Sequence, residues 1–107
     1  MRKIETQMNQ AVANNANWTN SNTSVHFNEH EGISIVRLHG NKIAEVCQGI
    51  LTIFDGGWQS NTTKSRLNAL LDEFSYGMRV FQKNFEWFVS YKNVSEDFVS
   101  GMELAID

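Results

Sequence analysis

Two histidines and two glutamates lie close together between His26 and Glu31. Such a cluster could bind a metal ion. In an extended strand, residues 26, 28 and 30 share one face, so His26 and His30 could point at the same ion. A metal site needs three or four ligands, however, and the only other histidine and thiol are His39 and Cys47. The cluster is therefore more typical of a polar strand face near a hairpin end, and we expect no metal.

Catalysis by a nucleophile has no supporting motif in this chain. The sequence lacks a Gly-x-Ser-x-Gly elbow, and Cys47 lies in an apolar run, where a lone cysteine is most often a small buried hydrophobe. Gly56-Gly57 lacks the Gly-Lys-Ser/Thr ending of a phosphate-binding loop. We expect no enzymatic activity and no cofactor, although the residue types leave a glycosidase-type carboxylate pair open.

The start of a predicted helix is the candidate binding site. Helix N-termini usually attract acidic residues, but here the first turn carries Lys64 and Arg66. Backbone N–H groups, hydroxyls and two cations favour an anion, such as a phosphate, a nucleotide or a carboxylate on a partner protein. Trp58 adds an apolar anchor of the kind found at interface centres. The predicted site comprises Trp58, Gln59, Asn61, Thr62, Thr63, Lys64 and Arg66. The alternative is an ordinary capped helix with solvated cations.

The helix itself is the clearest element of the sequence. Its apolar residues have the i, i+3, i+4, i+7 spacing of one buried face: Leu67, Leu70, Leu71 and Phe74. Thr62 or Thr63 occupies the expected N-cap position. A first helix is expected over residues 2–14, where Ile4, Met8, Ala11 and Val12 share a face, followed by a polar connector over 19–24.

Four apolar runs, at residues 25–27, 33–38, 43–47 and 50–54, predict the strands of an antiparallel meander that leads into the central helix. Gly40-Asn41 is a hairpin-turn signal. Further strands are expected after the helix. The predicted fold is α+β, with one antiparallel sheet of about 5–7 strands and two helices packed on it. Residues 1–107 are expected to form a single domain.

The segment 78–91 is the densest aromatic stretch of the chain. A turn at Lys83-Asn84 would divide it into a hairpin, with Phe81, Phe85 and Trp87 on one strand face. Together with nearby cations, such a face could stack nucleic-acid bases; the alternative is a hydrophobic core strand. Residues 98–99 are expected to form a last edge strand.

Composition restricts the partners that this chain can have. The 107 residues carry a formal charge of −3, which gives no general attraction to nucleic acid or anionic membranes. No apolar run reaches the roughly 18 residues of a membrane span, and the polar N-terminus lacks a signal-peptide core. We therefore expect a cytoplasmic protein without a membrane partner. The single cysteine, Cys47, excludes an internal disulfide.

Three segments resemble small proteins encoded by tailed bacteriophages: HGNKIA at 39–44, GGWQSNTTKSRLNALL at 56–71 and VFQKNFEWFV at 80–89. The resemblance implies action by binding in the host cell cytoplasm, and it carries over no functional residue. The leading hypothesis is a non-enzymatic phage accessory protein that binds a host protein or a small anionic ligand. The alternatives are a nucleic-acid-binding protein that uses the helix start at Thr63–Arg66, and a structural homodimer without a ligand.

Overall fold

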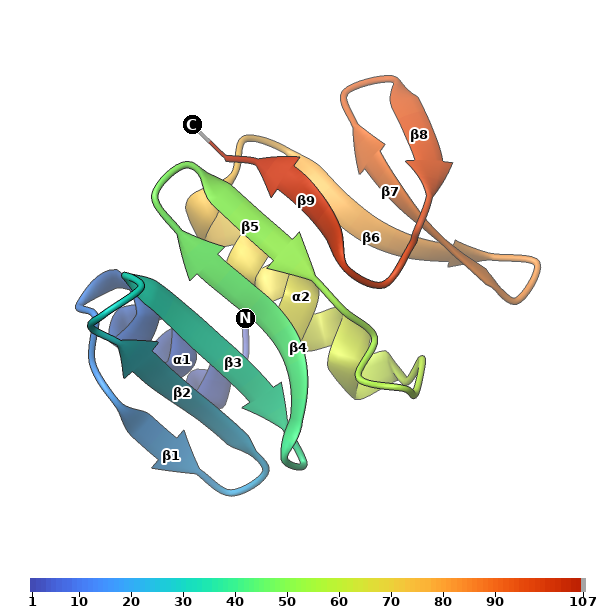
Figure 1. Ribbon diagram of the computed structural model, residues 1–107. Helices are drawn as coiled ribbons and strands as arrows, with labels where there is room; N and C mark the ends of the chain where they lie inside the picture. The colour runs from blue at the N-terminus through green and yellow to red at the C-terminus, as the bar shows by residue number, and fades with distance from the viewer. Residues whose placement is uncertain (107) are drawn as a thin grey trace.

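The computed structural model describes residues 1–106, which form two helices and nine strands (Figure 1). Their order is α1 (Lys3–Ala13), β1 (Trp18–Asn20), β2 (Thr23–Asn28), β3 (Ile33–Leu38), β4 (Asn41–Cys47), β5 (Ile50–Ile53), α2 (Asn61–Phe74), β6 (Met78–Lys83), β7 (Glu86–Tyr91), β8 (Val94–Asp97) and β9 (Met102–Ala105). The predicted α+β class is confirmed.

Six of the strands form sheet A, in the order β1-β2-β3-β4-β5-β9, with every neighbouring pair antiparallel. The first five follow one another along the chain, which confirms the meander. The predicted connector over 19–24 is instead the hairpin that joins β1 to β2. The expectation of one sheet was wrong in one respect, because β6, β7 and β8 form a separate three-stranded sheet B.

The N-cap of the central helix lies two or three residues before the predicted one. Ser60 is the N-cap, and its hydroxyl accepts a hydrogen bond from the Thr63 backbone N–H at 3.1 Å. The N-cap predicted at Thr62 or Thr63 was therefore wrong, since both residues lie inside α2. Neither helix in residues 1–106 is long and apolar enough to cross a membrane.

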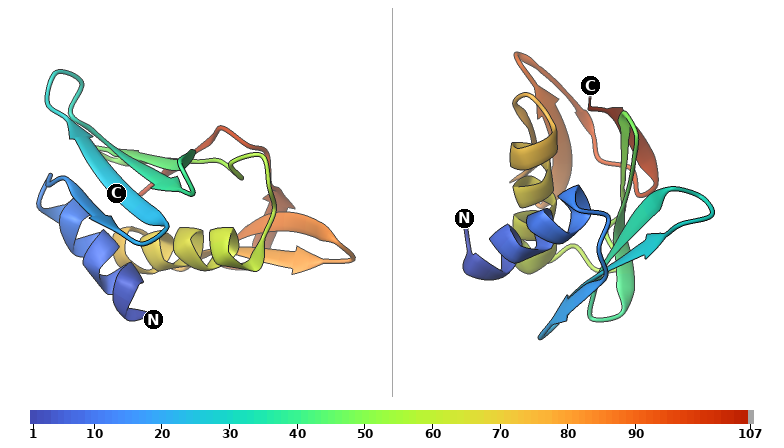
Figure 2. Two further views of the ribbon diagram at one scale, coloured as in Figure 1. Left: turned by 90° about the horizontal axis from the view of Figure 1, so that it is seen from below. Right: turned by 90° about the vertical axis from the view of Figure 1, so that its left-hand side faces the viewer.

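Both helices pack on the same face of sheet A (Figure 2). Their apolar residues meet the inward-facing side chains of the strands in one core, as the predicted spacing requires. The residues completely or almost completely buried there include Met8, Val36, Ile43, Leu51, Ile53, Leu67, Leu70 and Leu71. The opposite face of sheet A is covered by no described element.

Asn68 joins sheet B to α2. Its side-chain amide donates to the Val80 carbonyl at 2.9 Å, and its oxygen accepts from the Val80 N–H at 2.7 Å. The amide therefore pairs with both backbone groups of Val80, on the free edge of β6, as a neighbouring strand would. It blocks pairing with another chain at this residue. Val80, Trp87 and Val89 point from sheet B into the shared core.

The hairpin of sheet B differs from its prediction by one residue. The two turn residues are Asn84 and Phe85, and Phe81 lies opposite Phe88. Trp87 consequently faces the core while Phe81 and Phe88 face outward, so the predicted common face of Phe81, Phe85 and Trp87 was wrong. The edge strand predicted at 98–99 was also wrong, because those residues connect β8 to β9.

Candidate functional site

The structure divides the seven predicted site residues into an exposed group and a buried group. Trp58 is 75% exposed, and Gln59 and Asn61 are also exposed. Thr62 and Lys64 are half-buried. Thr63 and Arg66 are each only 3% exposed. The seven residues therefore do not form one continuous surface that a ligand could contact.

Arg66 turns inward and joins α2 to α1 and β2. Its Nη1 donates to Glu5 Oε2 at 2.8 Å, and its Nε donates to Thr23 Oγ1 at 3.0 Å. Nη2 lies 3.4 Å from Asn22 Oδ1, and Ser65 Oγ donates to the same Glu5 oxygen at 2.6 Å. The guanidinium is thus used entirely inside the protein. Arg66 is not part of an anion site that faces solvent.

The carboxylate of Glu5 is ionised by its partners despite its position in the interior. Burial raises the pKa of Glu5, but hydrogen bonds from Ser65 and Arg66, the Arg2 backbone N–H and the Arg66 charge more than offset it. The net effect lowers the pKa of Glu5 below its ordinary value of 4.5. An ionised Glu5 and a charged Arg66 therefore form a buried ion pair at neutral pH.

The hydroxyl groups at the start of α2 are also used internally. Thr63 Oγ1 lies 3.0 Å from Ser60 Oγ, where either can donate, and 3.4 Å from the Trp58 carbonyl. Lys64 Nζ is 3.5 Å from Gln82 Oε1, a long contact that leaves it largely available to solvent. Of the residues predicted at the helix start, Asn61, Thr62 and Lys64 remain at least partly exposed.

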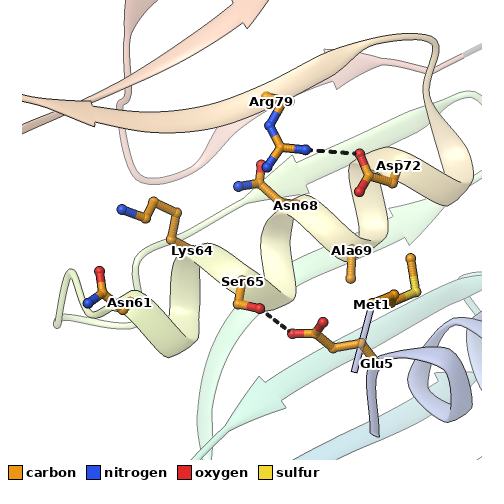
Figure 3. A pocket seen from close by; sticks show the side chains of 9 residues that line it. All are labelled: Met1, Glu5, Asn61, Lys64, Ser65, Asn68, Ala69, Asp72 and Arg79. Atoms are coloured by element: carbon orange, nitrogen blue, oxygen red, sulfur yellow. Dashed lines mark hydrogen bonds and ion pairs between the residues drawn. The ribbon is translucent and has the colours of Figure 1, made fainter. Parts of the chain in front are cut away.

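A cavity of about 370 Å³ lies beside Asn61 and Lys64, along the outer side of α2. Figure 3 shows Lys64, Asn68 and Arg79 on one side of the helix, and Ser65 and Glu5 on the other. Arg79 contacts Asp72 at 3.4 Å, and Glu5 is already paired with Arg66. Cations and carboxylates alternate around this cavity, so it has no concentrated positive charge for an anion.

A second group of exposed residues lies on the loop between β5 and α2 and at the tip of the β6–β7 hairpin; Figure 1 shows this loop at the lower right and the hairpin tip at the far right. Phe85, at the tip of the β6–β7 hairpin, is 93% exposed. Gln59 lines a cavity of about 280 Å³ with Phe85 and Phe98. Trp58, next to Gln59, lines a smaller cavity of about 60 Å³ against the β3–β4 turn. We call Trp58, Gln59 and Phe85 the aromatic end.

Sequence reasoning missed Phe85 as a surface residue because it placed the turn at 83–84. Alternation of apolar residues could not correct this, because a two-residue turn at 83–84 or at 84–85 leaves Val80, Trp87 and Val89 together on one face. The observed turn at Asn84-Phe85 pairs Phe81 with Phe88. The β3–β4 hairpin shows the same error, since its turn is His39-Gly40, with φ of 53° and 79°, in place of Gly40-Asn41.

The histidine cluster does not form the arrangement considered for a metal. His26 lies on β2, but His30 lies in the turn after the strand, so the two do not share a strand face. In residues 1–106, no three side chains of His, Cys, Asp or Glu come together as a metal site would require.

Comparison with known proteins gives a match that spans almost the whole chain. The family model described as Kyanoviridae Gp96 protein matches residues 1–105. No curated protein matches the chain, and no solved structure matches it. The matched region runs from α1 to β9 and includes the aromatic end.

Proposed function

The chain belongs to the Kyanoviridae Gp96 protein family of cyanophage proteins, and we propose that it is a non-enzymatic accessory protein that binds a host protein through the aromatic end. The resemblance to phage-encoded proteins is confirmed by this membership. The observation that carries the binding proposal is the exposure of two large aromatic side chains, Trp58 and Phe85, together with the cavity that Gln59, the neighbour of Trp58, lines with Phe85. Aromatic residues of this kind dominate the energetics of protein interfaces.

The backbone at Phe85 supports the same proposal. Asn84 and Phe85 both have positive φ, of 53° and 66°. Asparagine and glycine tolerate this left-handed conformation, whereas a bulky aromatic residue adopts it only at a cost in free energy. The hairpin therefore presents a phenylalanine to solvent at a position where glycine would be more stable. Such an outlier is a reason to look for function at the same place.

The proposal is tested by affinity capture from a nuclease-treated lysate of the cyanobacterial host. Tagged full-length protein is compared with Trp58→Ala and Phe85→Ala. The control is Tyr76→Ala, an aromatic residue that is 82% exposed at the other end of α2, about 21 Å away by helix length. We expect one host protein to be captured stoichiometrically, lost with Trp58→Ala or Phe85→Ala, and retained with Tyr76→Ala.

Two results would contradict the proposal. One is a host protein that both aromatic-end variants capture as well as the wild type. The other is loss of capture with Tyr76→Ala, which would indicate non-specific adhesion to aromatic side chains. For the identified partner, truncation of a central anchor should weaken the affinity by about 30-fold or more.

The small anionic ligand of the original hypothesis has weaker support in this structure. It would have to rely on Asn61 and Lys64, because Arg66 is buried against Glu5. Replacing Lys64 and Arg66 together would damage the core and could not isolate binding. Lys64→Ala alone is the appropriate variant, and unchanged host-protein capture by this variant would separate the aromatic end from the helix start.

Nucleic acid is a second candidate because of one specific arrangement on sheet B. Phe81 and Phe88 stack on its outer face with ring centroids 5.4 Å apart, and Arg79 and Lys83 share that face by strand alternation. Aromatic rings between cations can stack the bases of a single strand. Glu86 and Asp97 lie on the same face and oppose such binding.

An electrophoretic shift assay with single-stranded oligonucleotides at low salt tests this candidate. Binding through the outer face of sheet B should fall log-linearly with salt and should be lost with Phe81→Ala. Absence of a shift at the lowest salt concentration would remove the candidate. Loss of every captured partner after nuclease treatment would favour it over the host-protein proposal.

A further inference from the structure

Sheet B carries apolar side chains on its core-facing side that the core does not cover. Val89 points from this side into the core and is buried. Tyr91 follows two residues later on the same side, and the strand register places Met78 and Val94 opposite it. Tyr91 is nevertheless 41% exposed and Val94 is 71% exposed. The core is therefore open at this corner of the molecule.

A groove of about 570 Å³ lies over these exposed residues. Tyr91 and Val94 line it from sheet B, and β9 lines it from sheet A through Glu103, Leu104 and Ala105. Sheet A ends at β9, and no described strand pairs with the other edge of β9 (Figure 1). The groove therefore lies where one further strand of sheet A would lie.

The backbone of β9 presents unused hydrogen-bonding groups to this groove. The Ile106 N–H donates to the Gly49 carbonyl at 3.0 Å, on the side of β5. Residues that pair with a neighbouring strand alternate along an antiparallel edge, so Leu104 also pairs with β5. The N–H and C=O groups of Glu103 and Ala105 consequently point away from β5, toward the groove.

The edge of β6 shows the contrasting case. There the side chain of Asn68 occupies both backbone groups of Val80. Within residues 1–106, no side chain or backbone group hydrogen-bonds to the outward backbone groups of Glu103 and Ala105. Unpaired strand edges readily accept a strand from another chain. The edge of β9 is thus open to an extended segment, and apolar surface lies beside it.

The charges around the groove indicate which segment would fit. Glu96 on β8 and Glu103 on β9 both line it, and neither makes an ion pair in the described part of the chain. Lys92 is the one cation among the lining residues, and its ammonium lies 5.3 Å from the centre of the Tyr91 ring. The excess of carboxylates favours an occupant with basic side chains.

We propose that this groove binds an extended segment of a partner protein, in which basic and aliphatic residues alternate and which adds to β9 as a further strand. Its backbone pairs with Glu103 and Ala105, as in other cases of strand addition. Aliphatic side chains on one face cover Tyr91 and Val94, and a lysine or arginine on the other face lies beside Glu103. The site goes beyond the proposed function and shares no residue with the aromatic end.

The first test uses a synthetic probe and the full chain. The probe is a capped peptide of about eight alternating valine and lysine residues, a usual strand length. Amide NMR should show saturable shifts at Glu103 and Ala105, with slower exchange of both amide protons. Two control peptides should each bind about tenfold more weakly or worse. One replaces lysine with glutamate, and the other has every backbone nitrogen methylated and cannot donate.

Proline substitution then tests the pairing edge. Ala105→Pro removes an N–H that points into the groove, and proline is tolerated on an edge strand where its nitrogen has no partner. This variant should keep the Tm of the wild type and bind the probe about tenfold more weakly. Ser95→Pro is the matched control on the free edge of β8, where the alternation set by the Phe98 N–H and the Trp87 carbonyl leaves Ser95 unpaired. It should bind as the wild type does.

The apolar wall is tested by a variant that cannot damage the core. Val94→Lys should weaken binding of the probe by about tenfold, because it removes an apolar contact and repels the lysines. Val99→Lys is the control, since Val99 is 60% exposed and lies outside the groove. It should leave the affinity unchanged.

Any of three results would overturn the proposal. They are the absence of amide shifts at millimolar peptide, equal binding of the probe and the methylated peptide, and loss of binding with Ser95→Pro but not with Ala105→Pro. The last result would assign the segment to β8. None of these outcomes bears on capture through the aromatic end, which is tested with different residues and a different readout.

Discussion

Replacing Arg66 with alanine should destabilise the protein far more than replacing an exposed arginine would. The variant leaves the Glu5 carboxylate 3% exposed, with only Ser65 at 2.6 Å and the Arg2 backbone N–H at 3.3 Å as donors. It also removes the donor to Thr23 on β2. Three elements, α1, α2 and β2, therefore lose their common polar contact, and a buried charge loses its counter-ion.

The size of the effect follows from this uncompensated charge. Removing one partner of a buried ion pair costs about 3–5 kcal/mol, mostly through the desolvation of the charge that is left. For a domain of this length, such a loss corresponds to a decrease in Tm of about 12–20 °C. Exposed pairs contribute at most about 1 kcal/mol. Arg79→Ala, which removes the exposed contact to Asp72, is the matched control.

The assay is urea unfolding followed by circular dichroism, with the free energy of unfolding and the m-value compared for the wild type, Arg66→Ala and Arg79→Ala. A third variant, Glu5→Leu/Arg66→Met, removes both charges and replaces them with apolar volume. It should recover much of the stability that Arg66→Ala loses, because no unpaired charge remains. A loss below about 1 kcal/mol for Arg66→Ala would refute the reasoning, since that is the range of a surface pair.

Two further predictions concern the same part of the molecule. Asn68→Ala should cost about 1–3 kcal/mol for each Val80 backbone group left without a partner, and it should speed amide exchange in β6 relative to Asn61→Ala. For Glu5, whose pKa is lowered by folding, the stabilisation is fully present above pH 4.5 and is lost as the pH falls through the lower folded pKa. The stability difference between the wild type and Glu5→Gln should therefore shrink in acid, as pH-dependent urea unfolding would show.

The parts of the fold that depend on local pattern could be predicted from the sequence. The leucines of α2 have the spacing of one buried face, and Leu67, Leu70 and Leu71 are fully buried in the structure. The meander of β2 to β5 follows from alternating apolar runs that are separated by short turns, whereas β1 was predicted as part of a connector. In both cases, residues that are close in sequence make the decisive contacts.

The parts that depend on distant contacts could not be predicted in this way. The pairing of β9 with β5 crosses an entire helix and three strands, and no local pattern indicates it. Arg66 lies on the boundary of the helix face, and its inward orientation is determined by Glu5, which lies 61 residues away in the sequence. The cations Lys64 and Arg66 at the helix start therefore indicated a surface site. In the structure, Arg66 pairs with the buried Glu5, and Lys64 is half-buried.

The distribution of large side chains supports the proposal that the aromatic end binds a partner. A domain of about 100 residues has few large apolar groups with which to build a core, and burying one contributes about 1.5–3 kcal/mol. This chain instead exposes Trp58 and Phe85 to solvent. Two of its buried positions hold the charged residues Glu5 and Arg66, which pair with each other. Single exposed aromatic residues such as Tyr76 are common on protein surfaces, whereas Gln59, the neighbour of Trp58, and Phe85 line one cavity. A partner that covered the aromatic end would bury these side chains in the complex, and this is how the exposure of Trp58 and Phe85 supports the proposed binding.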